Sequence, residues 1–352
     1  SNFSNISKCD IIIICVPTPL KKNYSPDLSF IKATIDSIKK FLKKGQVIVL
    51  ESTSYPGTTK DEIYKKIKNR FVFGEDFFLG FSSERIDPGI NENSIQKIPK
   101  VVSGYSINCL KVISNFYSKS FNDIVESKNI EIAEFSKLLE NVYRSVNIGF
   151  INEMKILADK MKIDIFDVID VASTKPYGFR RFFPGPGIGG HCIPVDPHYL
   201  YWKSVKVGFP AKFIKLSGEI NILVLNFLLK KILKNLKNKK IPLIKSKILI
   251  LGLSYKKNLD DIRESASIKL IESLFKKGIK SISVYDPYVE GKILTKKIKK
   301  IKNLNSGTIR SSDIVVLMTD HDLFDYDLIK NNAKLIIDCR GRYKVANNVQ
   351  RG

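Results

Sequence analysis

The sequence predicts an α/β protein in which two parallel-sheet domains are joined by a long central helix and a helical region. In the first and last thirds of the chain, short apolar runs alternate with segments of helical apolar spacing. Between them, residues 130–160 keep a helical apolar stripe over about seven turns. Residues 235–240, rich in lysine and asparagine, indicate a linker. These features predict three domains, at residues 1–128, 129–236 and 237–352.

Strands and helices alternate regularly through the first third. The apolar runs predict strands at residues 10–16, 47–50, 77–81, 100–103 and 121–125. Helices are expected at residues 28–44, at residues 58–68 with Thr58 as the cap, and from Ser106. The opening run is continuously apolar, as in a strand buried on both faces of a parallel sheet. We therefore expect the first domain to be built on such a sheet.

The remaining elements follow the same signals. Helices are expected at residues 166–172, 197–207, 211–235 and 268–276. Strands are expected at residues 247–252, 281–287, 313–318 and 335–338. The last domain thus has a Rossmann-like pattern, although the turn at Gly252 lacks the GxGxxG spacing of a dinucleotide site.

Composition narrows the class of protein. The chain has 352 residues, a formal net charge of +24 and five cysteines that form no CxxC pair. The lysines are spread over apparent helices without interleaved aromatic side chains, which argues against a nucleic-acid surface. No apolar run approaches the length of a membrane span. The number and spacing of the cysteines favour a reducing, cytoplasmic location and no metal centre.

The loop at residues 185–197 holds four glycines, three prolines and Cys192, with Asp196 four residues after the thiol. Such a loop lets backbone N–H groups approach an anion closely, and it places Cys192 as a candidate nucleophile. One alternative is a tight structural loop with an incidental cysteine. A metal cluster that includes His191 and His198 is disfavoured, because no second group of ligands appears elsewhere.

Further polar residues follow predicted strands or share one face of a helix, where they could contact a ligand. Thr18, Thr53 and Glu84 each follow a predicted strand, and ligands of open α/β sheets bind at such ends. Lys137 and Asn141 lie one helical turn apart, hence on one face. Lys256 and Arg263 follow the first strand of the last domain and suit phosphate. For each residue, a turn, a cap or a solvated surface position is the alternative.

Together these motifs resemble one family. They are Val16–Pro19, Glu51–Thr53, Ser83–Arg85, Lys137–Asn141, Gly189–Asp196, Gly252–Lys256 and Asp260–Ser265. Their order is similar to that of the UDP-glucose/GDP-mannose dehydrogenase family across nearly the whole chain. Within it, residues 54–58 and 191–200 resemble the UDP-N-acetylglucosamine 6-dehydrogenase branch, with UDP-N-acetylmannosamine and UDP-glucose dehydrogenases as close competitors.

The resemblance implies oxidation of a sugar C6 alcohol to a carboxylate with two NAD per turnover, for surface polysaccharide precursors. Cys192 would form a thiohemiacetal and then a thioester. Either Asp196 through a water, or Lys137, would accept the hydroxyl proton. Lys137 and Asn141 would stabilise the oxyanion, and Lys137 would favour the thiolate. Glu84 would activate the water that hydrolyses the thioester.

The resemblance also implies the binding residues and the assembly. NAD would contact Val16, Thr18, Pro19, Ser52, Thr53 and Arg263. The UDP-sugar would contact Arg85, Phe183, Gly185, Gly187, Gly189, Lys256 and Arg340. The first domain would be the remainder of an NAD-binding domain, the middle one would carry the catalytic loop, and the last would bind the UDP-sugar. The helix at residues 130–160 would form a homodimer.

Two features depart from the family pattern. Many UDP-glucose members have a second glutamate four residues after the position of Glu84, where this chain has Pro88, so that role is not carried over. The opening strand, the GxGxxG turn and the acidic ribose-binding residue are not found, and we expect about 60–70 residues to precede this sequence in the family. The chain as given is therefore expected to bind NAD poorly and to be inactive, and a non-catalytic nucleotide-sugar-binding fragment is the alternative.

Overall fold

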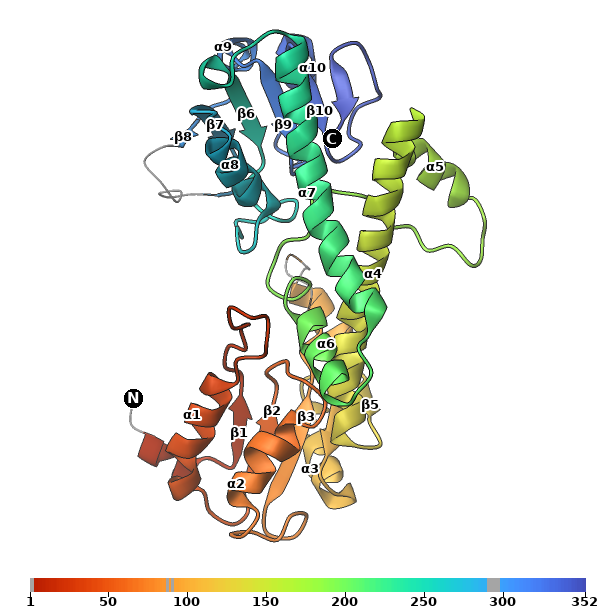
Figure 1. Cartoon of the computed structure of the whole chain (residues 1–352). Helices are drawn as coiled ribbons and strands as arrows, with labels where there is room; N and C mark the ends of the chain where they lie inside the picture. The colour runs from red at the N-terminus through yellow and green to blue at the C-terminus, as the bar shows by residue number, and fades with distance from the viewer. Residues whose placement is uncertain (1–2, 87–88, 90–91, 290–297) are drawn as a thin grey trace. The chain divides into compact units, whose positions relative to one another are not determined.

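The computed structural model describes residues 3–86, 89, 92–289 and 298–352, which fall into two compact units (Figure 1). The first unit comprises Ser1–Tyr143 and Val195–Lys212, and the second comprises Arg144–Pro194 and Phe213–Gly352. The predicted middle region is thus divided between the two units. Pro88, noted above for the missing second glutamate, lies outside the described residues.

The first unit contains a five-stranded sheet in sequential order, from β1 to β5. Its strands are β1 (Ile11–Ile14), β2 (Val47–Leu50), β3 (Phe78–Ser82), β4 (Lys100–Gly104) and β5 (Ile124–Glu126). All neighbours are parallel except β3 and β4, which are antiparallel. A parallel return needs a crossover of a dozen or more residues, usually a helix. The connection at residues 83–99 shows only the short 3-10 helix Glu92–Lys97 in its described part, so β4 runs back beside β3.

Helices cover this sheet largely as expected. They are α1 (Ser29–Ile38), the π-helical turn Thr59–Tyr64 with its continuation α2 (Lys65–Ile67), and α3 (Ile107–Tyr117). The helix predicted from Ser106 is confirmed, and Ser106 caps it by accepting a hydrogen bond from the Cys109 N–H. The predicted cap at Thr58 is wrong: its backbone is already helical, and its hydroxyl donates to the Tyr55 carbonyl at 2.6 Å.

The second unit contains a parallel six-stranded sheet of order β11-β10-β9-β6-β7-β8. Its strands are β6 (Lys247–Leu251), β7 (Ser281–Tyr285), β8 (Lys299–Lys300), β9 (Ile314–Leu317), β10 (Ile336–Asp338) and β11 (Val349–Arg351). Counted from β6, this is the 3-2-1-4-5-6 order of a dinucleotide-binding fold, with the order reversing between β6 and β9. The sheet is flanked by α8 (Ala266–Lys276), α9 (Ser306–Ser311) and α10 (Tyr326–Asn332) (Figure 1). The helices α9 and α10 and the strands β8 and β11 were not predicted.

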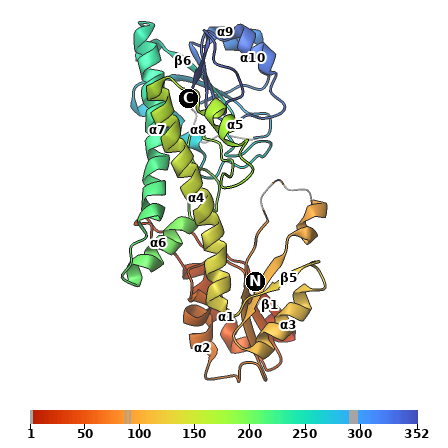
Figure 2. The same cartoon turned by 90° about the vertical axis from the view of Figure 1, so that its right-hand side faces the viewer.

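Two long helices run side by side in the second unit (Figure 1 and Figure 2). They are α7 (Lys212–Asn238) and the later part of α4 (Ile130–Met161), and their contacts advance together along both helices, so they are parallel. The linker predicted from residue 235 is wrong up to Asn238, because α7 continues there. Leu236 is fully buried in the core that α7 shares with β6, so its burial extends the helix through a polar sequence. The shorter helix α5 (Ile165–Ala172) also belongs to the second unit, whereas α6 (Asp196–Lys206) belongs to the first.

Candidate functional site

A buried carboxyl group lies at the start of α6 in the first unit. Asp196 is 4% exposed, and its Oδ2 accepts a hydrogen bond of 2.6 Å from Asn141 Nδ2 on α4. Burial raises the pKa of Asp196 to about 6, although the charge of Lys137 and the Asn141 hydrogen bond act to lower it. Asp196 can therefore exchange a proton near neutral pH, as a general base requires.

The structure brings together three of the five predicted catalytic residues. Lys137 and Asn141 share a face of α4, and the effect of Lys137 on Asp196 shows that this face is directed towards the carboxyl group. Asn141 is 5% exposed, so the alternative of a solvated surface position does not hold for it. Because both side chains can donate hydrogen bonds beside a buried acid, they suit an oxygen that develops negative charge.

One turn before Lys137, α4 carries a buried acid that the sequence analysis did not identify. Glu134 is fully buried and accepts hydrogen bonds from Gly57 N (2.5 Å), Thr59 N (2.9 Å) and Thr59 Oγ1 (2.7 Å). Glu134 thus accepts backbone N–H groups at the start of the helical turn Thr59–Tyr64, where the Thr58 side chain provides no cap. Burial raises the pKa of Glu134 to about 7, against the opposing hydrogen bonds. This contact ties the loop after β2 to the helix that bears Lys137 and Asn141.

The predicted cofactor residues line the carboxyl edge of β1 and β2. Ser52 Oγ donates to the Val16 carbonyl at 2.7 Å, which joins the turns after the two strands. Thr18 is buried beside the Tyr199 hydroxyl, and that hydroxyl donates to the Pro19 carbonyl at 3.3 Å. Thr53, which follows Ser52 in the chain, is half-buried. Because Tyr199 belongs to α6, the same helix contacts this edge and carries Asp196.

Two serine hydroxyls at this edge fit a bound polar ligand. Ser54 and Ser83 follow β2 and β3, and each is 1% exposed. Within the described part of the chain, neither Oγ has a hydrogen-bond partner. A buried hydroxyl without a partner is costly, and hydroxyl donors at the carboxyl ends of parallel strands are typical of nucleotide cofactor sites. The residues present therefore fit a dinucleotide cofactor.

Glu84 and Arg85 follow β3 and occupy different environments. Glu84 is about half exposed, and its Oε1 accepts the backbone N–H groups of Arg85 and Ile86, both at 2.6 Å. Arg85 pairs with Glu140 on α4 at 2.8 Å. Glu84 also faces the buried ammonium group of Lys100 at 3.6 Å, a partner that the sequence analysis did not predict.

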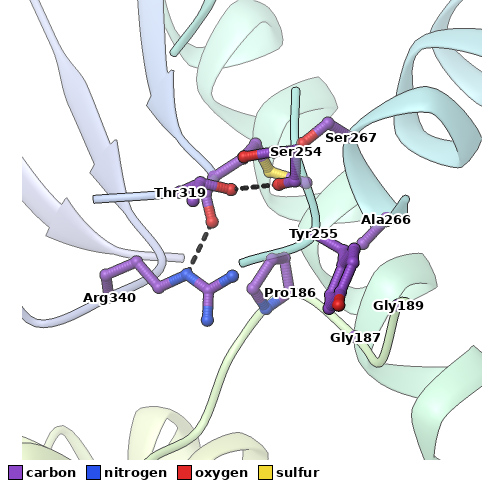
Figure 3. A pocket seen from close by; sticks show the side chains of 10 residues that line it. Pro186, Gly187, Gly189, Ser254, Tyr255, Ala266, Ser267, Thr319 and Arg340 are labelled. Atoms are coloured by element: carbon purple, nitrogen blue, oxygen red, sulfur yellow. Dashed lines mark hydrogen bonds between the residues drawn. The ribbon is translucent and has the colours of Figure 1, made fainter. Parts of the chain in front are cut away.

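A pocket of the second unit lies at the carboxyl ends of β6, β9 and β10 (Figure 3). Its wall is lined by Pro186, Gly187, Gly189, Ser254, Tyr255, Ala266, Ser267, Met318, Thr319 and Arg340. Arg340 Nε donates to the Met318 carbonyl at 2.6 Å, and Thr319 Oγ1 donates to the Ser254 carbonyl at 2.7 Å. The N-terminus of α8 and the Arg340 guanidinium both favour an anion. The pocket thus sits at the reversal of strand order, where such folds bind ligands.

The glycine loop approaches this pocket closely. A Cβ atom on Gly189 would lie 2.5 Å from Tyr255 Cβ, so only glycine fits there without a shift. Gly185 N donates to Asn152 Oδ1 of α4 at 2.9 Å, and Asn152 in turn donates to Asn221 of α7. Asn152 is a buried anchor for the loop that sequence reasoning missed. The predicted residues Gly185, Gly187, Gly189 and Arg340 therefore gather at one place.

Phe183 and Lys256, two predicted substrate residues of the second unit, are not among the residues that line this pocket. Phe183 is half exposed and stacks on Phe166 with ring centroids 6.3 Å apart. Lys256 follows the pocket residue Tyr255, and its carbonyl accepts from Ser254 Oγ at 2.9 Å.

Cys192 is exposed in the glycine loop of the second unit. The Arg263 guanidinium lies within electrostatic range of its thiol, and the pKa of Arg263 is raised chiefly by its hydrogen bonds to Asp261. Arg263, predicted as a phosphate and cofactor residue, is thus also a cation near the candidate nucleophile, where positive charge favours the thiolate. Burial and the charge of Arg263 lower the pKa of His191, the residue before Cys192.

Two other kinds of site are absent from the described residues: a helix that could span a membrane and a cluster of metal ligands. None of their helices is long and apolar enough to cross a membrane. No three of their histidine, cysteine, aspartate and glutamate side chains are grouped to hold a metal ion.

Comparison with known proteins gives one consistent family. Models of three domains of the UDP-glucose/GDP-mannose dehydrogenase family match the chain: the NAD binding domain at residues 1–121, the central domain at residues 131–222 and the UDP binding domain at residues 249–345. Protein CapL of Staphylococcus aureus is 32% identical over 97% of this chain and 81% of its own length.

Two further relatives differ in the substrate that their names give. The UDP-N-acetyl-D-glucosamine 6-dehydrogenase of Pseudomonas aeruginosa is 33% identical over 82% of this chain and 68% of its own length. The structure of a UDP-D-ManNAc dehydrogenase from Pyrococcus horikoshii matches with a TM-score of 0.85 and 28% identity, over 98% of this chain and 81% of that one.

Proposed function

Since the chain belongs to the UDP-glucose/GDP-mannose dehydrogenase family, and is thus an NAD-dependent UDP-sugar dehydrogenase, we propose that it oxidises the C6 hydroxyl of UDP-N-acetylglucosamine to the uronic acid. The observation that carries the oxidation is the buried Asn141–Asp196 pair, and the choice of UDP-N-acetylglucosamine rests on the resemblance of residues 54–58 and 191–200 to that branch. A carboxyl group with a pKa of about 6 can accept the hydroxyl proton at neutral pH. The product would serve as a precursor of surface polysaccharide.

The proposed cofactor residues are those at the carboxyl edge of the first sheet. They are Val16, Thr18, Pro19, Ser52 and Thr53, with Arg263 as a further contact; the unpartnered hydroxyls of Ser54 and Ser83 support a polar ligand at this edge. NAD held by these residues would supply the hydride acceptor for both oxidations. The location proposed for the enzyme is the cytoplasm, as the cysteine pattern favours.

The proposed chemistry assigns one task to each catalytic residue. Asp196, directly or through water, takes the C6 hydroxyl proton. The Cys192 thiolate then bonds to the aldehyde carbon as a thiohemiacetal, which the second oxidation converts to a thioester. Asn141 has a second N–H besides the one bound to Asp196, so it and Lys137 can donate to the oxyanion. Covalent attachment prevents the aldehyde from escaping between the steps.

Hydrolysis completes the proposed reaction. The Glu84 carboxylate takes a proton from water, the water oxygen bonds to the acyl carbon, and the carbon–sulfur bond breaks to release Cys192 as thiolate. Two features support this role: Glu84 is solvent-accessible, and its carboxylate is fixed by two backbone N–H groups. Arg85, which shares its loop, remains a proposed substrate contact.

The proposed site for the UDP moiety is the pocket at the ends of β6, β9 and β10. Gly185, Gly187, Gly189 and Arg340 meet there beside the N-terminus of α8, whose positive end and free N–H groups suit a diphosphate. Phe183 and Lys256, which do not line this pocket, are proposed to contact other parts of the substrate.

UDP-N-acetylmannosamine is the second candidate substrate, because relatives of similar identity carry that name. The test is NADH formation by the full-length protein with UDP-N-acetylglucosamine, UDP-N-acetylmannosamine and UDP-glucose, compared by kcat/KM. A preference for the first supports the proposal, and a preference for either other sugar replaces the substrate. UDP-sugar binding without NADH formation from any of the three would favour a non-catalytic binding protein instead.

We also propose that α4 forms a homodimer. Apolar side chains that are 44–59% exposed recur along one helix; they are Ile132, Phe135, Leu139, Tyr143, Phe150, Leu157 and Met161. Their spacing of three, four or seven residues places them on one face, as in helices that pack against another helix. A second copy of this chain supplies the matching face in a two-fold dimer.

A further inference from the structure

A buried lysine bridges two acidic residues in the first unit. Lys100 opens β4 and is 4% exposed, and its Nζ lies 3.0 Å from Glu51 Oε1 and 3.6 Å from Glu84 Oε2. Glu51 follows β2 and Glu84 follows β3, so the lysine reaches the carboxyl ends of two neighbouring strands from the antiparallel strand beside them. This bridge depends on the reversal of β4, since a parallel β4 would begin at the opposite edge of the sheet.

The surroundings fix the ammonium group in place. The rings of Tyr117 and Phe121 lie 5.2 Å and 5.3 Å from Nζ, and the Tyr117 hydroxyl donates to Glu51 Oε1 at 2.5 Å. A buried ammonium needs a paired charge, and Glu51, itself mostly buried, supplies one. The fold therefore does not need a second carboxylate at this position.

Glu84 is the second carboxylate, and its geometry is that of an oriented group. Its Oε1 receives two backbone N–H groups, whereas its Oε2 faces Lys100. Two N–H donors hold Oε1, and the positive charge of Lys100 at 3.6 Å favours an orientation with Oε2 towards it, although about half of the side chain is exposed. A general base must be held in such a way to meet its water at the correct angle.

We propose that Lys100 is a positioning residue for hydrolysis of the thioester, acting through Glu84. This inference rests on the proposed function. In the step that it supports, Glu84 removes a proton from water, the remaining hydroxide oxygen bonds to the acyl carbon, and Cys192 leaves as thiolate; the proton then passes from Glu84 to solvent. Lys100 itself touches neither the water nor the substrate. Its removal therefore slows the last step and spares the two oxidations.

The test separates the first turnover from the steady state. NADH formation by the full-length protein is followed after rapid mixing with NAD and the UDP-sugar, for wild type, Lys100→Met and the exposed control Lys97→Met. We expect Lys100→Met to keep the rate of the initial NADH burst within about twofold and to lower the steady-state rate by about 10- to 100-fold, which is less than the about 100- to 10,000-fold that general-base catalysis contributes, because Glu84 itself remains. Acyl-enzyme, detected by mass spectrometry after acid quenching, accumulates in this variant.

A double-mutant cycle identifies Glu84 as the group through which Lys100 acts. In a Glu84→Gln background, adding Lys100→Met should change the steady-state rate by less than about twofold, because coupled residues are not additive. Lys100→Arg should restore most of the rate, since it keeps the charge. Lys100→Gln, which can still hydrogen-bond Glu51, serves if Lys100→Met fails to fold.

Three results would overturn the inference. The first is that Lys100→Met slows the NADH burst as much as the steady state. The second is that Lys100→Met lowers the steady-state rate as much in the Glu84→Gln background as in wild type. The third is that Lys97→Met lowers the steady-state rate as much as Lys100→Met. If the wild-type protein forms no NADH with any UDP-sugar, the proposed function fails, and the inference fails with it. This failure is seen in the wild-type protein alone, so it is distinguishable from a failure of the inference.

Discussion

Asn141 on α4 donates a hydrogen bond of 2.6 Å to Asp196, a residue 55 positions later at the start of α6. The carboxyl group is buried, and only this hydrogen bond and the charge of Lys137 oppose the rise of its pKa to about 6. The amide thus both orients the proposed base and keeps it ionised at neutral pH.

Replacing Asn141 by alanine should therefore shift the pH dependence of NADH formation. Without the donor, the ionised form of Asp196 loses a stabilising hydrogen bond, so its pKa rises and the acidic limb of the profile moves to higher pH. The maximal rate should also fall by about 100-fold, because an oxyanion donor is lost. The measurement is kcat/KM from pH 5 to 9, with the exposed Asn115→Ala as control. An unchanged acidic limb in Asn141→Ala would contradict the assignment.

Glu134 should make the stability of the protein depend on pH. Its pKa in the folded chain is about 7, above the usual 4.5. The folded chain therefore binds more protons in this range, so the contribution of Glu134 to the free energy of unfolding is full below about pH 4.5 and is lost as the pH rises through 7. In wild type the free energy of unfolding should decrease by up to about 3 kcal/mol over this pH range because of Glu134, and Glu134→Gln should remove this decrease. Urea unfolding between pH 4.5 and 8 measures it.

The matched control for this experiment is Glu153→Gln, an exposed glutamate farther along α4. It should leave the slope of stability against pH nearly as in wild type. If Glu134→Gln and wild type gave the same slope, the buried carboxyl group would not be the source of the pH dependence.

Cys192→Ser should abolish release of the uronic acid, because a serine alkoxide does not form at neutral pH and no thioester can be made. We expect a loss of at least about 1,000-fold in acid formation, measured by chromatography of the product. The exposed Cys9→Ser is the matched control and should keep wild-type activity. A fully active Cys192→Ser protein would refute the thioester mechanism.

Gly189→Ala should weaken binding of UDP. The added methyl group would meet Tyr255 Cβ at 2.5 Å, which forces the glycine loop or the wall of the pocket to move. We expect the Kd of UDP, measured by calorimetry, to increase about tenfold, or about 1.4 kcal/mol. Gly218→Ala on α7, where the methyl group meets nothing within 4 Å, is the control. Equal affinities of the two variants would remove the loop from the UDP site.

Charged substitutions on the exposed stripe of α4 should dissociate the proposed dimer. Leu139→Glu places a charge at the centre of the apolar face, where it would be buried without a partner. Light scattering after size exclusion should give the mass of one chain for Leu139→Glu and of two chains for wild type and for Val72→Glu, an exposed site outside α4. A wild-type monomer, or a dimer that survives Leu139→Glu, would exclude this interface.

The sequence determined the main elements because their signals are local. A continuous apolar run predicted β2 over Val47–Leu50, and the serine at position 106 predicted the start of α3. The elements that it missed, β8 and β11, have two and three residues, too few for any period to be seen. The direction of β4 was also beyond local signals, because it depends on the connection that precedes it.

For the site, residue type and motif order were enough to select Cys192, Asn141 and Asp196, since their chemistry is distinctive and they resemble a family. Only the tertiary structure revealed Glu134, Lys100 and Asn152. Each is a common polar residue whose partner lies on another element, and the contacts of Glu134 span 75 and 77 positions. Burial, which removes water as the competing partner, decides which such residues must pair. The sequence thus determined which groups can react, and the packing of α4 and β4 against the strand ends decided how Glu84 and Asp196 are held.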